Sequence, residues 1–148
     1  MNRATSIQKR AIRIINSAKY NSHTDPLFKT SKILKIRDLY EYNACLFVYD
    51  FTNNRLPTSF DKIFKYNHQI QKLHQTRLSN SIFVPTHKNK FSAQLPPYNL
   101  PKIWNMLHTN IRHVGHRNQF KHVLKSNYFD KYNSQVSCQN KYCQSCNK

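Results

Sequence analysis

Apolar residues at helical spacing predict an amphipathic helix near the N-terminus. The apolar stripe of this helix consists of Ile7, Ala11, Ile14, Ile15 and Ala18. Its opposite side is basic and carries Lys9, Arg10 and Arg13. Thr5 or Ser6 is expected to cap the start, and the polar residues 16–22 are expected to end the helix. The basic side is either a face for a phosphate backbone or the solvated side of a core helix.

A second helix is predicted to start within residues 23–28 (HTDPLF). Thr24 or Asp25 would cap it, and Pro26 would take the first helical position, where a missing N–H does no harm. His23 stands just outside this helix, and a structural hydrogen bond is the role expected for it.

Residues 36–51 have the strongest helical pattern in the chain. Apolar side chains form one stripe of Leu39, Tyr42, Leu46 and Tyr49, and a second stripe of Tyr40, Phe47 and Phe51. So broad an apolar surface is expected to be largely buried, with Cys45 as a small core residue. Asn53 and Asn54 should end this helix, and a shorter helix is expected around Phe60, Ile63 and Phe64.

The second half of the chain has weaker periodicity. Residues 67–81 predict a long basic loop, and residues 81–85 a short extended piece. Pro96, Pro97 and Pro101 are expected to exclude a helix interior from residues 95–101. Trp104 is interpreted as a core anchor, with stacking on a base as the alternative. A last helix is predicted over residues 116–128. It would bury Phe120, Val123 and Leu124 and display Arg117, Lys121 and Lys125.

These patterns predict a mostly α fold with long irregular loops that contain proline and at most a short β element. By composition the chain divides into residues 1–66, a basic region over 67–130 and a cysteine-containing tail over 131–148.

Charge changes the picture, because Lys and Arg outnumber Asp and Glu by 24 to 6, a formal net charge of +18. A chain this basic favours DNA or RNA as a partner, bound through phosphates with a steep dependence on salt. Compositional drift in a chain rich in Asn, Ile and Tyr is the alternative source of the lysine excess. Residues 62–129 hold eleven Lys or Arg and no carboxylate, which marks them as a candidate binding region.

Targeting signals are not expected. No apolar run is long enough for a transmembrane helix, and the first ten residues lack the apolar core of a signal peptide. We therefore expect an intracellular protein of the nucleus or cytoplasm that is neither secreted nor bound to a membrane.

The sequence lacks the residue clusters that two common kinds of catalytic centre need. Two-metal phosphoryl transfer needs clustered carboxylates, whereas the six carboxylates of this chain are scattered singly. With one glycine there is no glycine-rich phosphate loop either. The chain is accordingly not expected to be an enzyme on its own, and no cofactor is required.

A zinc site is the one cofactor that the sequence suggests. Cys138, Cys143 and Cys146 stand in C-x4-C-x2-C spacing, and thiolates two residues apart are a common half of such a site. The fourth ligand would come from His113, His116 or His122, from beyond Lys148, or from a second chain. The alternative is a thiol-bearing tail without a metal.

Several short blocks occur in an order that resembles a known family: residues 7–15 (IQKRAIRII), 23–28 (HTDPLF), 33–40 (ILKIRDLY), 54–57 (NRLP), 74–77 (HQTR) and 101–105 (PKIWN), followed by Phe120 and Lys121. They resemble the C-terminal portion of the reverse transcriptases of LINE-type, jockey-like retrotransposons that lack long terminal repeats. The blocks span most of residues 6–125. The chain departs from the family pattern at Leu100, where glycine is common, and at Met106–His108.

The resemblance implies a helical, thumb-like region that follows the polymerase palm and cradles template and primer. It implies phosphate contacts by Lys9, Arg10, Arg13, Arg77 and Lys102. Charge and position add Lys72, Lys88, Lys90, Arg112, Arg117 and Lys121 as further nucleic-acid-binding candidates. The aspartate-bearing palm and the fingers would belong to the missing part of the parent polymerase. A small zinc module and a non-functional remnant of a mobile element are the alternatives.

Overall fold

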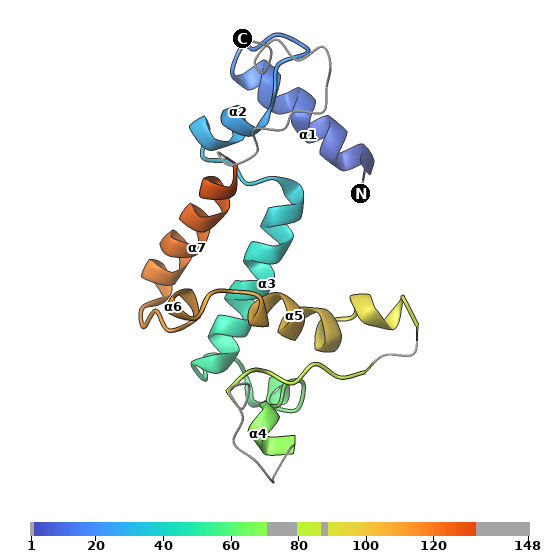
Figure 1. Ribbon diagram of the computed structural model, residues 1–148, viewed down its shortest axis with the longest axis vertical. Coiled ribbons are helices and arrows are strands. Elements are labelled where there is room, and N and C mark those ends of the chain that lie inside the picture. Colours follow the sequence, from blue (N-terminus) through green and yellow to red (C-terminus); the bar gives the residue numbers. More distant parts are fainter. Residues whose placement is uncertain (1, 71–79, 87–88, 133–148) are drawn as a thin grey trace. The chain divides into compact units, whose positions relative to one another are not determined.

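The computed structural model describes residues 2–70, 80–86 and 89–132, and helices dominate these ranges (Figure 1). The elements, in chain order, are α1 (Asn2–Ile15), α2 (Asp25–Thr30), α3 (Ile36–Thr52), the 3-10 turn η1 (Thr58–Phe60), α4 (Asn67–Ile70), the 3-10 turn η2 (Ser92–Gln94), α5 (Pro96–Asn105), α6 (Thr109–Arg112) and α7 (Arg117–Lys131). An isolated antiparallel bridge joins Tyr66 to Ile82. The prediction of a mostly α fold with at most a short β element is confirmed.

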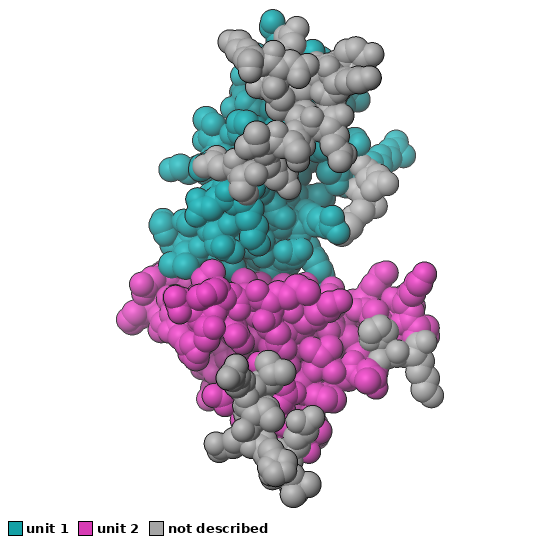
Figure 2. Space-filling model, viewed as in Figure 1, with its two compact units in different colours: residues 1–42, 121–148 teal, residues 43–120 magenta. Residues whose placement is uncertain are grey.

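The chain forms two compact units, which Figure 2 colours separately. Unit 1 comprises residues 1–42 and 121–148, and unit 2 comprises residues 43–120. The boundaries fall inside α3 and α7. Unit 1 joins two segments that are distant in sequence, whereas unit 2 is one continuous segment. The ranges 1–66, 67–130 and 131–148 were drawn from composition and stay a prediction.

Helix α1 buries a different side from the one that its apolar stripe predicts. Ile12 is buried, whereas Ile7, Ile14 and Ile15 are exposed, Ile14 by 77%. The buried side is held by polar contacts, because the Gln8 amide donates to the Leu34 carbonyl (2.9 Å) and accepts from the Ile36 N–H (2.9 Å). The helix also begins at Asn2, before the predicted caps Thr5 and Ser6. In the described residues, the apolar stripe is therefore not the buried side of this helix.

Unit 1 packs around a small aromatic cluster. Ile12 of α1, Phe28 of α2 and Tyr132, which follows α7, are buried together. Leu27 and Phe129 pack against them. The rings of Phe28 and Tyr132 meet edge to face, with centroids 6.5 Å apart. Pro26 lies in the first turn of α2 as predicted, but the Thr24 side chain makes no capping hydrogen bond there.

Helices α1, α2 and α3 end without glycine. Just after each helix, Ser17, Lys32 or Asn54 has a positive φ of 48°, 53° or 54°. In each case the next N–H bonds five residues back, as from Ile33 to the Phe28 carbonyl (3.0 Å), which is the Schellman arrangement. Asn54 thus ends α3 as predicted. Its side chain tolerates the left-handed conformation better than most, whereas Ser17 and Lys32 take it at a cost.

The core of unit 2 is built on the second half of α3. Cys45, Val48 and Tyr49 are buried, which confirms Cys45 as a core residue. The ring of Tyr49 stacks on Phe120, with centroids 4.2 Å apart. The Tyr49 hydroxyl is shared between the carbonyls of Val114 (2.9 Å) and Gly115 (2.8 Å).

The first half of α3, which belongs to unit 1, is less buried than the broad apolar pattern predicts. Leu39 and Tyr40 are each 44% exposed. Phe47 and Phe51, in unit 2, are half-buried and contact aromatic rings of the segment that includes η1; the Phe51 and Phe64 centroids lie 5.0 Å apart. The predicted helix around Phe60 is reduced to η1.

Helix α5 contradicts the expectation that its prolines exclude a helix. Pro96 and Pro97 occupy the first turn, where the N–H groups have no helical partner in any case. Pro101 lies inside the helix and is buried. Pro101 has no backbone N–H, so one hydrogen bond is missing from this ten-residue helix, and the helix tolerates the loss. Trp104 on this helix is 4% exposed, which confirms it as a core residue.

The long loop predicted over residues 67–81 can be compared with the structure only at its ends, because residues 71–79 lie outside the described residues. Residues 67–70 form the short helix α4 rather than part of a loop. The predicted extended piece contains Ile82, whose backbone makes two hydrogen bonds with the Asn105 side chain. The Asn105 Nδ2 donates to the Ile82 carbonyl (2.7 Å), and the Oδ1 accepts from the Ile82 N–H (3.3 Å). Helix α7 extends to Lys131, beyond the predicted end at residue 128, and buries Phe120 and Leu124 as expected, with Val123 half-buried.

Candidate nucleic-acid interface

Three predicted phosphate-binding residues lie along α1. Lys9 and Arg10 are exposed, and Arg13 is half-buried. The Arg13 Nε donates to the Ser22 carbonyl (3.0 Å), which ties the guanidinium to the loop after the helix. The other two guanidinium nitrogens are left to donate to a ligand. Lys9, Arg10 and Arg13 form the α1 basic face, which is adjacent to the exposed isoleucines of the same helix.

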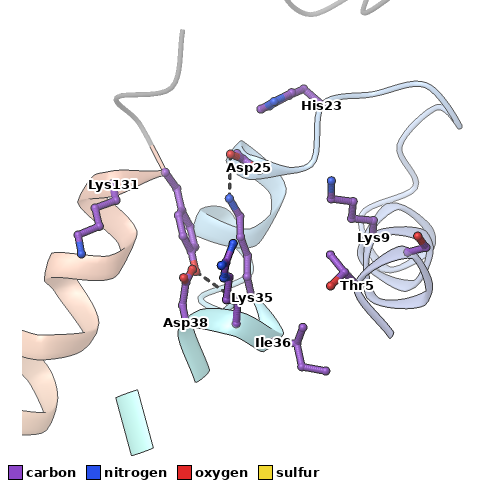
Figure 3. Close-up of a pocket in the computed structure, with 11 residues that line it drawn as sticks. Thr5, Lys9, His23, Asp25, Lys35, Ile36, Asp38 and Lys131 are labelled. Atoms are coloured by element: carbon purple, nitrogen blue, oxygen red, sulfur yellow. Dashed lines mark hydrogen bonds and ion pairs between the residues drawn. The ribbon is translucent and has the colours of Figure 1, made fainter. Parts of the chain in front are cut away.

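Lys9 also borders a hollow of about 780 Å³ within unit 1, the unit 1 pocket (Figure 3). The pocket brings together cationic side chains from three helices and the loop before α3: Lys9 of α1, Lys35, Arg37 of α3 and Lys131 of α7. His23, Asp25 and Asp38 also line it. The four cations outnumber the two carboxylates, so the pocket carries a net positive charge.

Both carboxylates of the pocket have structural partners. Asp25 pairs with the Lys35 ammonium at 2.8 Å, and the Asp25 side chain is 9% exposed. The Tyr132 hydroxyl donates to Asp38 and accepts from the Lys35 N–H (3.0 Å) (Figure 3). The Lys35 Nζ lies 4.3 Å from the Tyr132 ring centroid. Lys9 and Arg37 are exposed and have no ion pair within the part of the chain that the structure describes, so their charges can serve a ligand.

Tyr132 links this pocket to the core of unit 1. Burial, and after it the hydrogen bond to Asp38, raises the pKa of the Tyr132 phenol above its ordinary value of 10.0. The folded chain therefore keeps a proton that the unfolded chain loses near pH 10, and stability falls as pH rises through that region.

Replacing this phenol tests the linkage. The free energy of unfolding should fall less steeply above about pH 10 in Tyr132→Phe than in the unsubstituted chain, because phenylalanine has no proton to lose. Urea denaturation across alkaline pH measures the slope. Tyr20→Phe is the matched control, since Tyr20 is 84% exposed, and an equal change in both variants would contradict the assignment.

The predicted residues of unit 2 are dispersed. Lys90 and Lys102 are exposed. Arg112 lines a different pocket, within unit 2. Arg117, which was expected to point outward, makes a two-pronged ion pair with Asp50, with Nε and Nη2 each 2.8 Å from a carboxylate oxygen. Its charge is thus largely matched inside unit 2, and its contact with nucleic acid stays a prediction. Lys121 is half-buried on α7 in unit 1.

Some predicted site residues lie outside the described residues: Lys72, Arg77, Lys88, Cys138, Cys143 and Cys146. The zinc site therefore stays a prediction. Among the residues that are described, no group of three His, Cys, Asp or Glu side chains could hold a metal ion.

Sequence reasoning missed three cationic contributors to the unit 1 pocket: Lys35, Arg37 and Lys131. Two of them flank Ile36 in the block ILKIRDLY, which is a local signal of positive charge. Their proximity to Lys9 and Lys131 depends on contacts between segments that are far apart in the chain, and no sequence spacing encodes it.

Comparison with known proteins adds no relative. No family model, curated protein or solved structure matches the chain. In the described ranges, no helix has both the length and the apolarity needed to cross a membrane.

Proposed function

We propose that this chain binds the phosphate backbone of DNA or RNA, and that it is the thumb-like, post-palm part of a retrotransposon reverse transcriptase of the LINE type. The observation that carries the proposal is the convergence of Lys9, Arg37 and Lys131 at one pocket whose carboxylates already have partners. The α1 basic face continues this positive surface with Arg10 and Arg13.

Charge supports a polyanion over a small acidic ligand. The formal charge of +18 is spread over the chain, and neutralising several phosphates releases their condensed counterions. The exposed Lys90 and Lys102 are available for additional contacts of the same kind. Contact of this type positions a nucleic acid without reading its sequence.

The reverse-transcriptase part of the proposal rests on the ordered sequence blocks. Three of the chain's six carboxylates, Asp25, Asp38 and Asp50, are engaged with Lys35, Tyr132 and Arg117. Carboxylates with such partners are poorly placed to hold a pair of metal ions. In this proposal the bond-forming aspartates belong to the palm of the parent polymerase, and this chain supplies template and primer contact only.

The salt dependence of binding tests the proposal. Affinity for a duplex labelled with a fluorophore should fall steeply as salt rises, with a slope in the logarithmic plot of about −0.9 for each phosphate neutralised. Fluorescence anisotropy over a series of salt concentrations measures that slope. A flat salt dependence, or absence of binding at low ionic strength, would overturn phosphate contact as the function. Primer extension by the isolated chain would overturn the proposal that the catalytic aspartates belong to a separate palm.

A further inference from the structure

A second pocket, within unit 2, has a chemistry different from that of the unit 1 pocket. This unit 2 pocket has a volume of about 580 Å³, inside the range typical of small-molecule sites. Its walls include aromatic and imidazole rings together with amide and hydroxyl groups, from the end of α3, from α4, from α5 and from residues 109–115. None of the described residues that line it is a carboxylate.

Arg112 provides the first sign of a ligand. Its Nε is buried and has no hydrogen-bond partner among the described residues. A buried donor of a charged group is costly to leave unsatisfied, and this Nε is enclosed by protein, out of a ligand's reach. Arg112 nevertheless lies in the wall of the unit 2 pocket, where an incoming oxygen or ring nitrogen could reach the terminal nitrogens of its guanidinium.

Two stacked rings provide the second sign. Tyr66 and His68 lie nearly parallel, with an interplanar angle of 12° and centroids 5.5 Å apart. Tyr66 is held in place by the bridge to Ile82 and by contact with Phe51, at 6.4 Å between centroids. Both rings line the same pocket as Arg112. A stacked pair of flat rings is suited to a flat aromatic ligand.

We infer that the unit 2 pocket accepts one nucleotide of a single-stranded nucleic acid, with the base against Tyr66 and His68 and a phosphate or base acceptor on Arg112. A nucleotide combines the flat ring and the acceptor that these two features call for separately. Inorganic phosphate would satisfy only Arg112, and an uncharged aromatic molecule would satisfy only the rings. Asn53 and Asn80 add amide groups that can bond a base edge.

This inference rests on the proposed nucleic-acid function but adds contact with a base to contact with phosphates. It also gives Arg112, which was predicted from charge and position, a defined place: this residue would act inside a pocket rather than on an open basic surface. The unit 1 pocket would hold backbone, and the unit 2 pocket would hold a nucleotide that has left the base stack.

Trp104 makes the inference testable, because it is the single tryptophan of the chain and lines the unit 2 pocket. The full chain is titrated with a short oligothymidylate and with an abasic oligomer that has the same number of phosphates. Binding is followed by anisotropy and by tryptophan emission. The oligothymidylate should change the Trp104 emission and bind about tenfold more tightly than the abasic oligomer.

Substitution locates the effect. Arg112→Gln should remove most of the preference for the oligothymidylate while leaving binding of the abasic oligomer within about threefold. Lys102→Gln is the matched control: this exposed residue lies on the same helix as Trp104, and its loss should weaken both oligomers equally. The comparison of the two oligomers on the unsubstituted chain stands even if Arg112→Gln fails to fold.

The outcomes separate the two proposals. Equal binding of both oligomers without a change in Trp104 emission would overturn the nucleotide pocket and leave phosphate contact intact. The same emission change with inorganic phosphate alone would also overturn it, in favour of a simple anion site. Failure of both oligomers to bind at low salt would overturn the proposed function and the pocket together.

Discussion

Replacing Phe120 by alanine is expected to lower the free energy of unfolding by about 3–5 kcal/mol. Phe120 is completely buried, its ring is stacked on Tyr49 at 4.2 Å and it lies 6.0 Å from Trp104. The substitution removes apolar area and leaves a cavity between α3, α5 and α7 residues of unit 2. A loss of this size would consume much of the stability that a small domain has.

Urea denaturation followed by circular dichroism measures this effect, with Trp104 fluorescence as a second reading close to the cavity. Phe91→Ala is the matched control, because Phe91 also belongs to unit 2 but is 73% exposed. Its replacement should change the free energy of unfolding by no more than about 0.5 kcal/mol. Equal losses in the two variants would show that the stacked cluster is not the core of this unit.

Removing three charges from the α1 basic face is expected to have the largest effect on nucleic-acid binding. The variant combines Lys9→Gln, Arg10→Gln and Arg13→Gln. If each residue neutralises one phosphate of a duplex, the slope of log affinity against log salt should become shallower by about 2.7. The affinity at low salt should fall by about a hundredfold, with little change in helix content, because glutamine is also a good helix former.

A control variant that removes three positive charges elsewhere distinguishes direct phosphate contact by α1 from general attraction by the net charge of the chain. Arg55, Lys62 and Lys65 are exposed residues of unit 2. Replacing these three by glutamine lowers the net charge equally but should alter the slope by less than about 1. Equal slopes for the two triple variants would show that α1 provides no specific face.

Local sequence patterns were sufficient for most helices. The span of α3 and the stop at Asn54 agree with the structure to within a residue, because a strong apolar periodicity and a residue that tolerates positive φ act over short distances. Pro26 marks the first turn of α2 for the same reason. Helix α7 was found as well, with its end displaced, since the last turn of a helix frays or extends according to its tertiary contacts.

Two local rules failed where tertiary contacts outweighed them. In α5, Pro101 is accepted inside a helix because burial of Pro101 and Trp104 offsets one missing hydrogen bond. In α1, the hydrogen bonds of Gln8 to residues 34 and 36 orient the helix, so that Ile12 rather than the isoleucine stripe faces the core. Periodicity shows that a helix has two sides but does not show which one finds a partner.

The candidate sites were predictable only in part. Lys9 and Arg112 could be named from charge and position, whereas the partners that make each a site could not. Arg117 shows the limit most clearly, because its ion pair with Asp50 joins residues 67 positions apart. A positive charge is visible in the sequence, but whether that charge is already matched depends on which carboxylate the fold brings beside it.

By itself, the sequence determined that this chain is basic, mostly helical and without clustered carboxylates. These properties follow from composition and from interactions within a few residues. The tertiary structure decided which cations meet at the unit 1 pocket, which arginine is matched by an aspartate and which buried arginine nitrogen is left without an acceptor among the described residues. Those outcomes depend on distances between segments far apart in the chain, and electrostatic and hydrogen-bond energies are set by such distances.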